Sequence, residues 1–188
     1  IGENFKFGKD RSGDIEKLRK YNSKKAFELI VPKFETHNGL KISSSRIRNL
    51  LNQGDIIGAR ECLGREYMLS GTVVSGEKLG RELGYPTANI KLEYDYPLDG
   101  VYLTRTVIEE KNYVGLASLG NKPTFNGSEK ILEVFILDFD EDIYSQNIEV
   151  YFLEEIRKQI KFSNEDELIK QMNEDHKYAI INSKKYGI

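Results

Sequence analysis

The chain has 188 residues, and its 28 lysines and arginines nearly balance 30 aspartates and glutamates, which gives a net charge of −2. At about 100–200 residues per domain, this length allows one domain or two small ones. The balanced charge excludes the global basic excess by which many proteins bind nucleic acid or anionic membranes. A single cysteine, Cys62, excludes an internal disulfide and is typical of a reducing, cytoplasmic compartment.

No part of the sequence is typical of a membrane span or a signal peptide. The longest largely apolar stretch, residues 131–137, contains Glu133 and is far shorter than the roughly 20 residues that cross a bilayer. The chain begins at Ile1, and residues 1–5 are typical of the interior of a longer sequence. We therefore expect the N-terminus to be a cut.

Residues before Gly64 favour helices and loops, beginning with a basic loop that glycines interrupt. Asp14 is placed to cap a short helix that runs through Leu18. Residues 27–31 then predict a strand that ends at Pro32.

Two further helices are predicted before the composition changes. Serines at positions 43–45 precede residues 46–51, whose apolar side chains have helical spacing, and Gly54 ends this helix. Asp55 caps a second helix, which ends at Gly64. We expect these helices to connect two unequal parts of the chain.

Residues from Met68 onward alternate or run apolar between turn signals, which predicts short strands. Six strands are expected, at residues 71–74, 88–92, 100–108, 113–119, 132–139 and 148–153. Strands at this spacing with no helices between them predict an antiparallel sandwich or a small closed barrel.

After Phe162 the pattern changes to that of a helix. Ser163, with Asp166 three residues later, predicts a capping-box start. An apolar face that we expect to close one end of the barrel is formed by Leu168, Met172, His176 and Ala179 or Ile180.

The segment from Gly76 to Asn89 has three glycines four residues apart, two basic side chains, and then a hydroxyl and an amide two residues apart. Glycine loops let backbone N–H groups approach phosphate oxygens, and basic side chains add positive charge. On a strand, Thr87 and Asn89 point to the same face, where both could ligate Mg²⁺. The alternative is a long polar hairpin loop whose glycines serve turns, since the pattern is neither the Walker nor the dinucleotide motif. The candidate residues are Gly76, Lys78, Gly80, Arg81, Gly84, Thr87 and Asn89.

The order of these residues resembles the signature of riboflavin kinases. The resemblance rests on Gly71-Thr72-Val73, Gly76, Gly80-Arg81, Leu83-Gly84 and Pro86-Thr87-Ala88-Asn89-Ile90, and it continues in residues 119–125, 132–139, 156–157 and 161–163. Upstream, residues 54–71 are similar to the junction in bacterial bifunctional enzymes that join an FMN adenylyltransferase to a riboflavin kinase. Residues 2–8 and 42–48 resemble later motifs of that adenylyltransferase.

The resemblance implies a mainly β fold. Residues 65–188 would form the riboflavin kinase domain, a six-stranded antiparallel Greek-key barrel with a C-terminal helix. Residues 1–64 would be a partial α/β nucleotidyltransferase segment followed by a helical linker. The implied reaction transfers the γ-phosphoryl group of ATP to the 5′-hydroxyl of riboflavin with Mg²⁺, which produces FMN.

The resemblance also implies a role for each candidate residue. Thr87 and Asn89 would hold Mg²⁺ and the ATP phosphates, and the backbone around Gly76, Gly80 and Gly84 would close over them. Glu133 would orient and deprotonate the ribityl hydroxyl. A loop, a metal and one carboxylate suffice, because phosphoryl transfer depends mostly on positioning and charge neutralisation.

Glu133 also stands out without the family. It is one acid inside an apolar run, on the opposite strand face from Leu132 and Val134. The alternative to a catalytic role is an ordinary solvent-facing strand residue.

Three positions depart from the family pattern. Ser118 stands where asparagine is more common, Tyr85 where phenylalanine is common, and Phe135 where histidine is frequent. None of these is assigned to metal binding or proton transfer, but Ser118 and Phe135 concern the flavin side of the site. Arg157 is the candidate for flavin binding there, and its alternative is a surface arginine.

The adenylyltransferase reaction needs a histidine-rich phosphate-binding motif, and this chain has only His37 and His176. His37 fits a polar turn, and His176 fits a structural position on the final helix. Residues that could contact nucleotide phosphates in an intact module are Ser43, Ser44, Ser45, Arg46 and Arg48, although the serines also fit a helix cap. We expect no FAD synthesis from this chain alone.

Two other functions are compatible with the sequence. One is a non-catalytic flavin-binding or nucleotide-binding barrel, including one that stacks single-stranded nucleic acid on aromatic rings, although the net charge argues against that ligand. The other is FAD synthesis as the main role, against which the missing histidine motif argues. The expected partners are riboflavin and ATP, with no nucleic acid or membrane.

Overall fold

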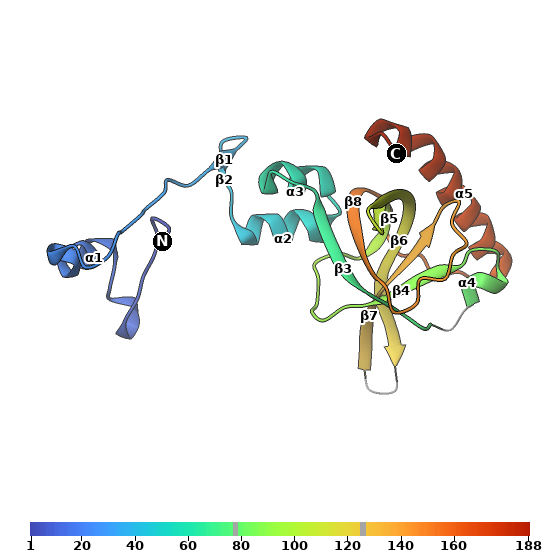
Figure 1. Cartoon of the computed structure of the whole chain (residues 1–188), viewed down its shortest axis with the longest axis horizontal. Coiled ribbons are helices and arrows are strands. Elements are labelled where there is room, and N and C mark those ends of the chain that lie inside the picture. The colour runs from blue at the N-terminus through green and yellow to red at the C-terminus, as the bar shows by residue number, and fades with distance from the viewer. Residues whose placement is uncertain (77–78, 125–126) are drawn as a thin grey trace. The chain divides into compact units, whose positions relative to one another are not determined.

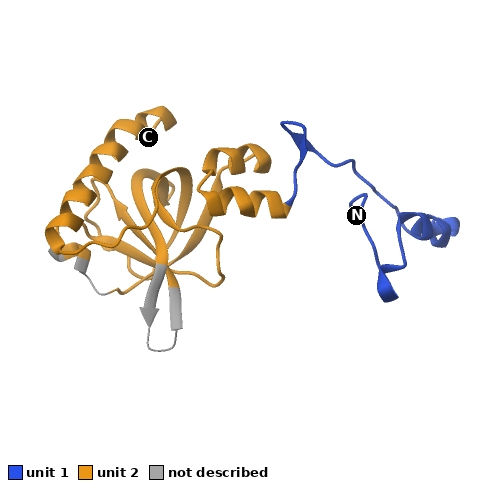
Figure 2. Ribbon diagram, turned by 180° about the vertical axis from the view of Figure 1, so that it is seen from behind, with its two compact units in different colours: residues 1–43 blue, residues 44–188 orange. Residues whose placement is uncertain are grey.

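The computed structural model of the chain describes residues 1–76, 79–124 and 127–188. It contains two compact units, residues 1–43 and residues 44–188 (Figure 2). The two helices that the sequence predicts as a connector belong to the second unit, together with the strands that follow them.

The first unit has little regular structure. It contains the 3-10 helices η1 (Lys9–Arg11) and η2 (Asn22–Lys24), the helix α1 (Ile15–Tyr21), and a hairpin of β1 (Thr36–His37) and β2 (Leu40–Lys41). Asp14 caps α1 as predicted, because its carboxylate accepts the backbone N–H of Lys17 at 3.0 Å. His37 lies beside the hairpin turn, which agrees with its interpretation as part of a polar turn.

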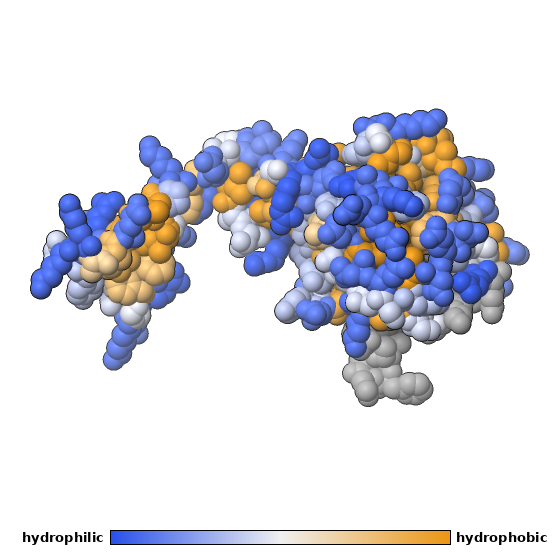
Figure 3. Space-filling model, viewed as in Figure 1, coloured by the Kyte–Doolittle hydropathy of each residue, from blue (hydrophilic) through white to orange (hydrophobic). Residues whose placement is uncertain are grey.

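The predicted strand at residues 27–31 is wrong, because this segment has no regular structure. A strand needs a neighbour that pairs with its backbone N–H and C=O groups, and β1 and β2 pair with each other. Phe27 and Ile30 remain 46% and 62% exposed. Figure 3 shows apolar side chains gathered on the visible face of this unit.

The second unit begins with the two predicted helices, α2 (Ser44–Gln53) and α3 (Ile56–Leu63). Asp55 caps α3 by accepting the backbone N–H of Gly58 at 2.8 Å, and Gly64 ends α3 in the left-handed conformation with φ +68°. The buried side chains Leu51, Ile56 and Ala59 join the core of the barrel, so these helices extend that core.

Six strands form a closed antiparallel barrel (Figure 1). They are β3 (Tyr67–Val74), β4 (Thr87–Lys91), β5 (Gly100–Ile108), β6 (Lys111–Thr124), β7 (Gly127–Ile136) and β8 (Asn147–Arg157). The order around the barrel is β3-β4-β7-β6-β5-β8. Because β8 returns to lie beside β5 after the consecutive neighbours β5, β6 and β7, this part is a Greek key. The barrel predicted from the sequence is therefore confirmed.

Alternate residues on each strand face the interior of the barrel, and the opposite residues form its outer wall. On β7, Leu132 and Val134 are fully buried in the core that all six strands share. A separate apolar cluster on the outer wall contains Leu103, Leu116 and Leu153, and Ala179 of helix α5 (Glu165–Ser183) packs against it. The prediction that the final helix closes one end of the barrel is thus wrong, because α5 covers the outer wall.

Helix α5 begins one residue later than the sequence predicts. Asn164 is its N-cap and accepts the backbone N–H of Glu167 at 2.9 Å. The Glu167 carboxylate accepts the backbone N–H of Ser163 at 3.0 Å, so Asn164 is the cap and Glu167 bonds back to the residue before it. The remaining elements are the short helix α4 (Leu79–Glu82) and the 3-10 helix η3 (Lys184–Tyr186). Among the described residues, no helix is long and apolar enough to cross a membrane.

Candidate active site

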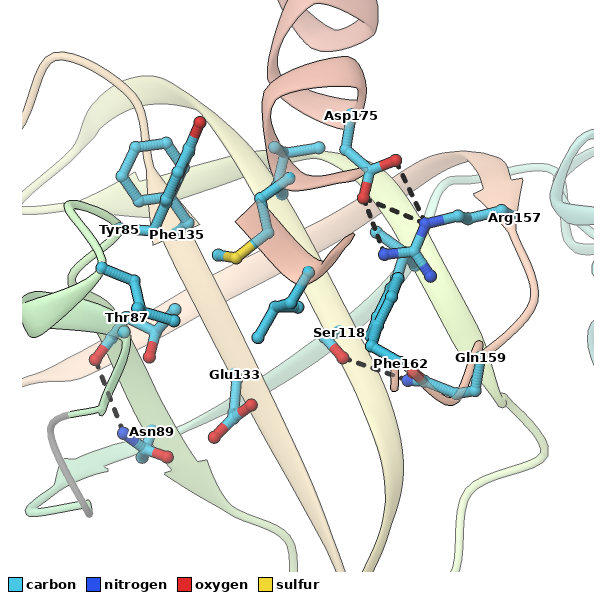
Figure 4. A pocket seen from close by; sticks show the side chains of 16 residues that line it. Tyr85, Thr87, Asn89, Ser118, Glu133, Phe135, Arg157, Gln159, Phe162 and Asp175 are labelled. Carbon is cyan, nitrogen blue, oxygen red and sulfur yellow. Dashed lines mark hydrogen bonds and ion pairs between the residues drawn. The ribbon is translucent and has the colours of Figure 1, made fainter. Parts of the chain in front are cut away.

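A cavity of about 340 Å³ lies between the outer wall of the barrel and α5 (Figure 4). Polar side chains of β4 and β7 line one part of it, and the last residues of β8 with the first half of α5 line another part. The lining residues are Gly80, Leu83, Tyr85, Thr87, Asn89, Val101, Leu116, Ser118, Glu133, Phe135, Arg157, Gln159, Phe162, Leu168, Met172 and Asp175.

Thr87, Asn89 and Glu133 come together on two neighbouring strands. Thr87 and Asn89 are two residues apart on β4, so both side chains face the cavity as the sequence predicts. Glu133 of β7 is the direct cross-strand partner of Asn89. Its neighbours Leu132 and Val134 point into the core, which leaves the Glu133 carboxylate on the cavity side. Figure 4 shows the three side chains projecting into one part of the cavity.

Two glycines before β4, Gly76 and Gly80, lie close to this part of the site. A Cβ atom at Gly76 would overlap the Asn89 amide, and one at Gly80 would overlap the backbone carbonyl of Tyr85. The backbone N–H of Tyr85 donates to the Gly80 carbonyl at 2.7 Å, which closes the turn. Gly84 has φ +82°, a conformation that residues with a Cβ rarely adopt. At each of these three positions the fold itself favours glycine over a residue with a Cβ atom.

The two predicted basic residues of this turn have different outcomes. Arg81 is exposed and lines a second cavity of about 320 Å³. This cavity also contacts Thr87 and is bounded by Pro86, Ile143 and Tyr144. Lys78 lies outside the described residues. Thr87 is thus a shared wall of two neighbouring cavities.

Arg157 is not a surface residue, because its side chain is only 16% exposed and lines the first cavity. Its guanidinium group forms an ion pair with Asp175 of α5, with an Nη2–Oδ2 distance of 2.8 Å. The strand pairing shifts register between Val101 and Tyr102 of β5, opposite residues 155–157, and such a bulge redirects side chains. Arg157 is the residue that directly follows this bulge, and its side chain contacts α5.

Aromatic rings join the polar and apolar parts of the cavity. The ring of Tyr85 lies edge-on to those of Phe135 and His176, at centroid distances of 5.1 and 6.1 Å. The Tyr85 hydroxyl donates to the Asn173 side chain of α5 at 2.7 Å. Burial, and then the charge of Asp175, raises the pKa of Tyr85, so this hydroxyl remains a donor at neutral pH. His176 thus takes part in ring packing, as its structural interpretation predicts.

Several lining residues were missed in the sequence, and Asp175 and Gln159 are the clearest. The Gln159 amide donates to the Ser118 hydroxyl at 3.0 Å and to the Leu119 carbonyl at 3.1 Å, which ties the segment after β8 to β6. Asp175 follows Leu168 by seven residues and Met172 by three, so it lies on the helix face that was predicted to be buried. An acid on a predicted apolar face is the signal that could have revealed it.

The donor set indicates which chemistry the site can support. Among the described residues, no group of three or more histidine, cysteine, aspartate or glutamate side chains could hold a metal ion. A hydroxyl, an amide and one carboxylate remain, and these oxygen donors suit a hard cation that takes its other ligands from phosphate groups. The first cavity is large enough for a small organic ligand.

Comparison with known proteins identifies the family of this chain. Residues 63–181 match the riboflavin kinase family (Flavokinase). The bifunctional riboflavin kinase/FMN adenylyltransferase of Buchnera aphidicola (subsp. Schizaphis graminum) is 38% identical over 180 residues, which are 93% of this chain and 58% of that protein. The protein of the same name from Escherichia coli K12 is 35% identical over 177 residues, which are 93% of this chain and 56% of that protein.

A crystal structure from Streptococcus pneumoniae, titled a macrolide-efflux protein, has a TM-score of 0.80 and 37% identity to this chain. It covers 95% of this chain, which corresponds to 58% of that one. The chain spans about three fifths of the length of the curated relatives, and it is homologous to their C-terminal part. With a family match over more than half its residues and this barrel, the chain belongs to the riboflavin kinase family.

Proposed function

We propose that this chain transfers the γ-phosphoryl group of ATP to the 5′-hydroxyl of riboflavin. The observation that carries the proposal is the meeting of Thr87, Asn89 and Glu133 at one place on the outer wall of the barrel. Two cavities share Thr87, so two different substrates can meet beside that residue. ATP is assigned to the cavity that Arg81 lines, and riboflavin to the cavity between the barrel and α5.

Mg²⁺ fits the residues on this part of the cavity. The Asn89 amide nitrogen points to the Thr87 backbone carbonyl at 3.5 Å, which leaves the Asn89 amide oxygen and the Thr87 hydroxyl as candidate ligands. When bound, the ion would neutralise charge on the phosphate oxygens. The backbone near Gly80 and the Arg81 side chain would hold the same phosphates from the other side.

We assign to Glu133 the role of proton acceptor. Its carboxylate accepts the proton of the ribityl hydroxyl while the new oxygen–phosphorus bond forms and the bond from the γ-phosphorus to the leaving oxygen of ADP breaks. Glu133 lies on the same sheet face as Asn89, so its carboxylate is next to the residues proposed to bind phosphate. This pairing supports the proposal, because phosphoryl transfer depends on reacting groups held close together.

The other part of the cavity is assigned to the isoalloxazine ring. Leu116, Phe135, Phe162 and Met172 supply apolar contact area, while Arg157 lies at the edge of this region. A ring system held here would direct its ribityl chain along β7 toward Glu133. Ser118 and its partner Gln159 supply polar groups on the same side.

The direct test is product formation. The protein is mixed with riboflavin, ATP and Mg²⁺, and FMN is followed by chromatography, with a parallel sample that contains a chelator in excess. FMN in the first sample and none in the second is the expected result. If the folded protein forms no FMN, a non-catalytic flavin-binding barrel is the better account, and riboflavin fluorescence quenching without turnover would identify it.

A second activity is proposed only for the longer proteins. Because the relatives named for both activities are longer than this chain, we propose that residues 1–43 are part of an FMN adenylyltransferase module. FMN and ATP incubated with this chain alone should yield no FAD. Detection of FAD in that assay would contradict this assignment.

A further inference from the structure

An ion pair fastens helix α5 to the end of the last barrel strand, at the edge of the cavity (Figure 4). Arg157 donates from Nε to both Asp175 oxygens at 3.1 and 3.0 Å, and from Nη2 to Oδ2 at 2.8 Å. Asp175 is only 4% exposed. Paired N–H donors on a carboxylate restrict direction as well as distance, so this contact fixes the helix at one register.

The polar groups of the pair are largely occupied by protein partners. Arg157 Nη1 donates to the Lys158 carbonyl at 3.2 Å, and Asp175 Oδ1 also accepts the Gln171 amide at 3.0 Å. A buried charge that loses its partner is strongly unfavourable, which keeps the two groups together. Arg157 is therefore suited to act through α5, and less suited to direct binding of a ligand.

The position of α5 determines the shape of the cavity. Leu168, Met172 and Asp175 lie at helical spacing on one face and all line it, opposite the barrel residues Leu116 and Phe135. A change in register or tilt of α5 would move Leu168 and Met172 together. The ion pair therefore sets the position of this apolar wall, because Asp175 belongs to the same helix face as Leu168 and Met172.

We propose that Arg157 and Asp175 are a positioning pair, which holds Leu168 and Met172 of α5 against the ring of riboflavin. The inference rests on the proposed function and adds to it the element that sets riboflavin affinity. The phosphate-binding residues Thr87 and Asn89 lie on β4, away from the pair, so ATP use is independent of it.

The test replaces both charges at once. In Arg157→Met with Asp175→Leu, apolar side chains fill the site, and such replacements of buried ion pairs can preserve stability. We expect the thermal midpoint to stay near that of the wild type. The KM for riboflavin should rise about tenfold, while kcat and the KM for ATP stay within about twofold. Asp175→Asn, which keeps the shape of the side chain, should raise the riboflavin KM in the same direction.

Arg105→Met is the matched control, because Arg105 forms a half-buried ion pair with Glu66 on the barrel but does not line the cavity. It should leave both KM values unchanged. A riboflavin KM at the wild-type level in the folded double variant would overturn the proposal, and so would an equal rise in the KM for ATP. If the wild type makes no FMN, the proposed function fails instead. Riboflavin fluorescence quenching then still tests the pair, since a tenfold loss of affinity supports it and unchanged affinity overturns it.

Discussion

Replacement of Gly80 by alanine tests whether the glycine-rich turn positions Thr87. Gly80 is in the short helix α4, where alanine is favoured over glycine by about 1 kcal/mol. The added Cβ would overlap the Tyr85 carbonyl, and overpacking of this kind costs about 1–3 kcal/mol. The difference, about 0–2 kcal/mol, makes the free energy of unfolding a weak indicator.

Activity is the sharper indicator for Gly80→Ala. The Tyr85 carbonyl must move away from the new Cβ, and Tyr85 is two residues before Thr87. Misplacement of a reacting group by about 1 Å can lower a rate about 100-fold, so we expect a loss of about 10-fold to 100-fold in kcat/KM for ATP. FMN formation at varied ATP concentration measures this loss, and thermal unfolding shows that the protein remains folded.

Gly84→Ala is the matched control in the same turn. A Cβ at Gly84 would meet no atom within 4 Å, but its φ of +82° would strain the backbone by about 1–2 kcal/mol. We expect this variant to lose stability and to keep most of its ATP kinetics. Wild-type ATP kinetics in Gly80→Ala, or an equal kinetic loss in both variants, would refute the reasoning.

Three further predictions concern the metal, the core and alkaline pH. Asn89→Ala should raise the Mg²⁺ concentration for half-maximal FMN formation by about tenfold or more, and an unchanged Mg²⁺ titration would contradict the ligand assignment. Leu132→Ala, in the fully buried position beside Glu133, should lower the free energy of unfolding by about 2–5 kcal/mol, as measured by urea denaturation. Burial raises the pKa of Tyr67 from 10.0 to about 12, so the folded protein holds this proton longer than the unfolded chain and its stability falls as pH rises through this range. Tyr67→Phe should reduce that fall, which denaturation midpoints between pH 9 and about 12 can check.

The sequence predicts local features of the fold well. Asp14, Asp55 and Gly64 act as helix ends because caps depend on residues within a few positions. The six strands follow from hydrophobic spacing and turn residues, and the resemblance to the family supplies their closure into a Greek-key barrel. The strand predicted at residues 27–31 is wrong because a strand needs a pairing partner, and local spacing does not reveal one.

The candidate site is only partly predictable for the same reason. Thr87 and Asn89 face one side because strands alternate, and Glu133 can be placed opposite Leu132 and Val134 by the same rule. The pairing of Arg157 with Asp175, by contrast, joins residues 18 positions apart through the packing of α5 on the outer wall. Spacing within a helix shows which residues share a face, but it does not show which part of the barrel that face covers.

The most direct measurement compares FMN formation by the wild type and by Glu133→Gln, which keeps the size of the side chain and removes its basic carboxylate. We predict FMN formation by the wild type, and a kcat at least about 100-fold lower in the variant with riboflavin binding retained. Glu149→Gln is the control, because Glu149 is a strand glutamate that does not line the cavity, and it should keep the wild-type rate. No FMN from the wild type, or a full rate in Glu133→Gln, would contradict the account.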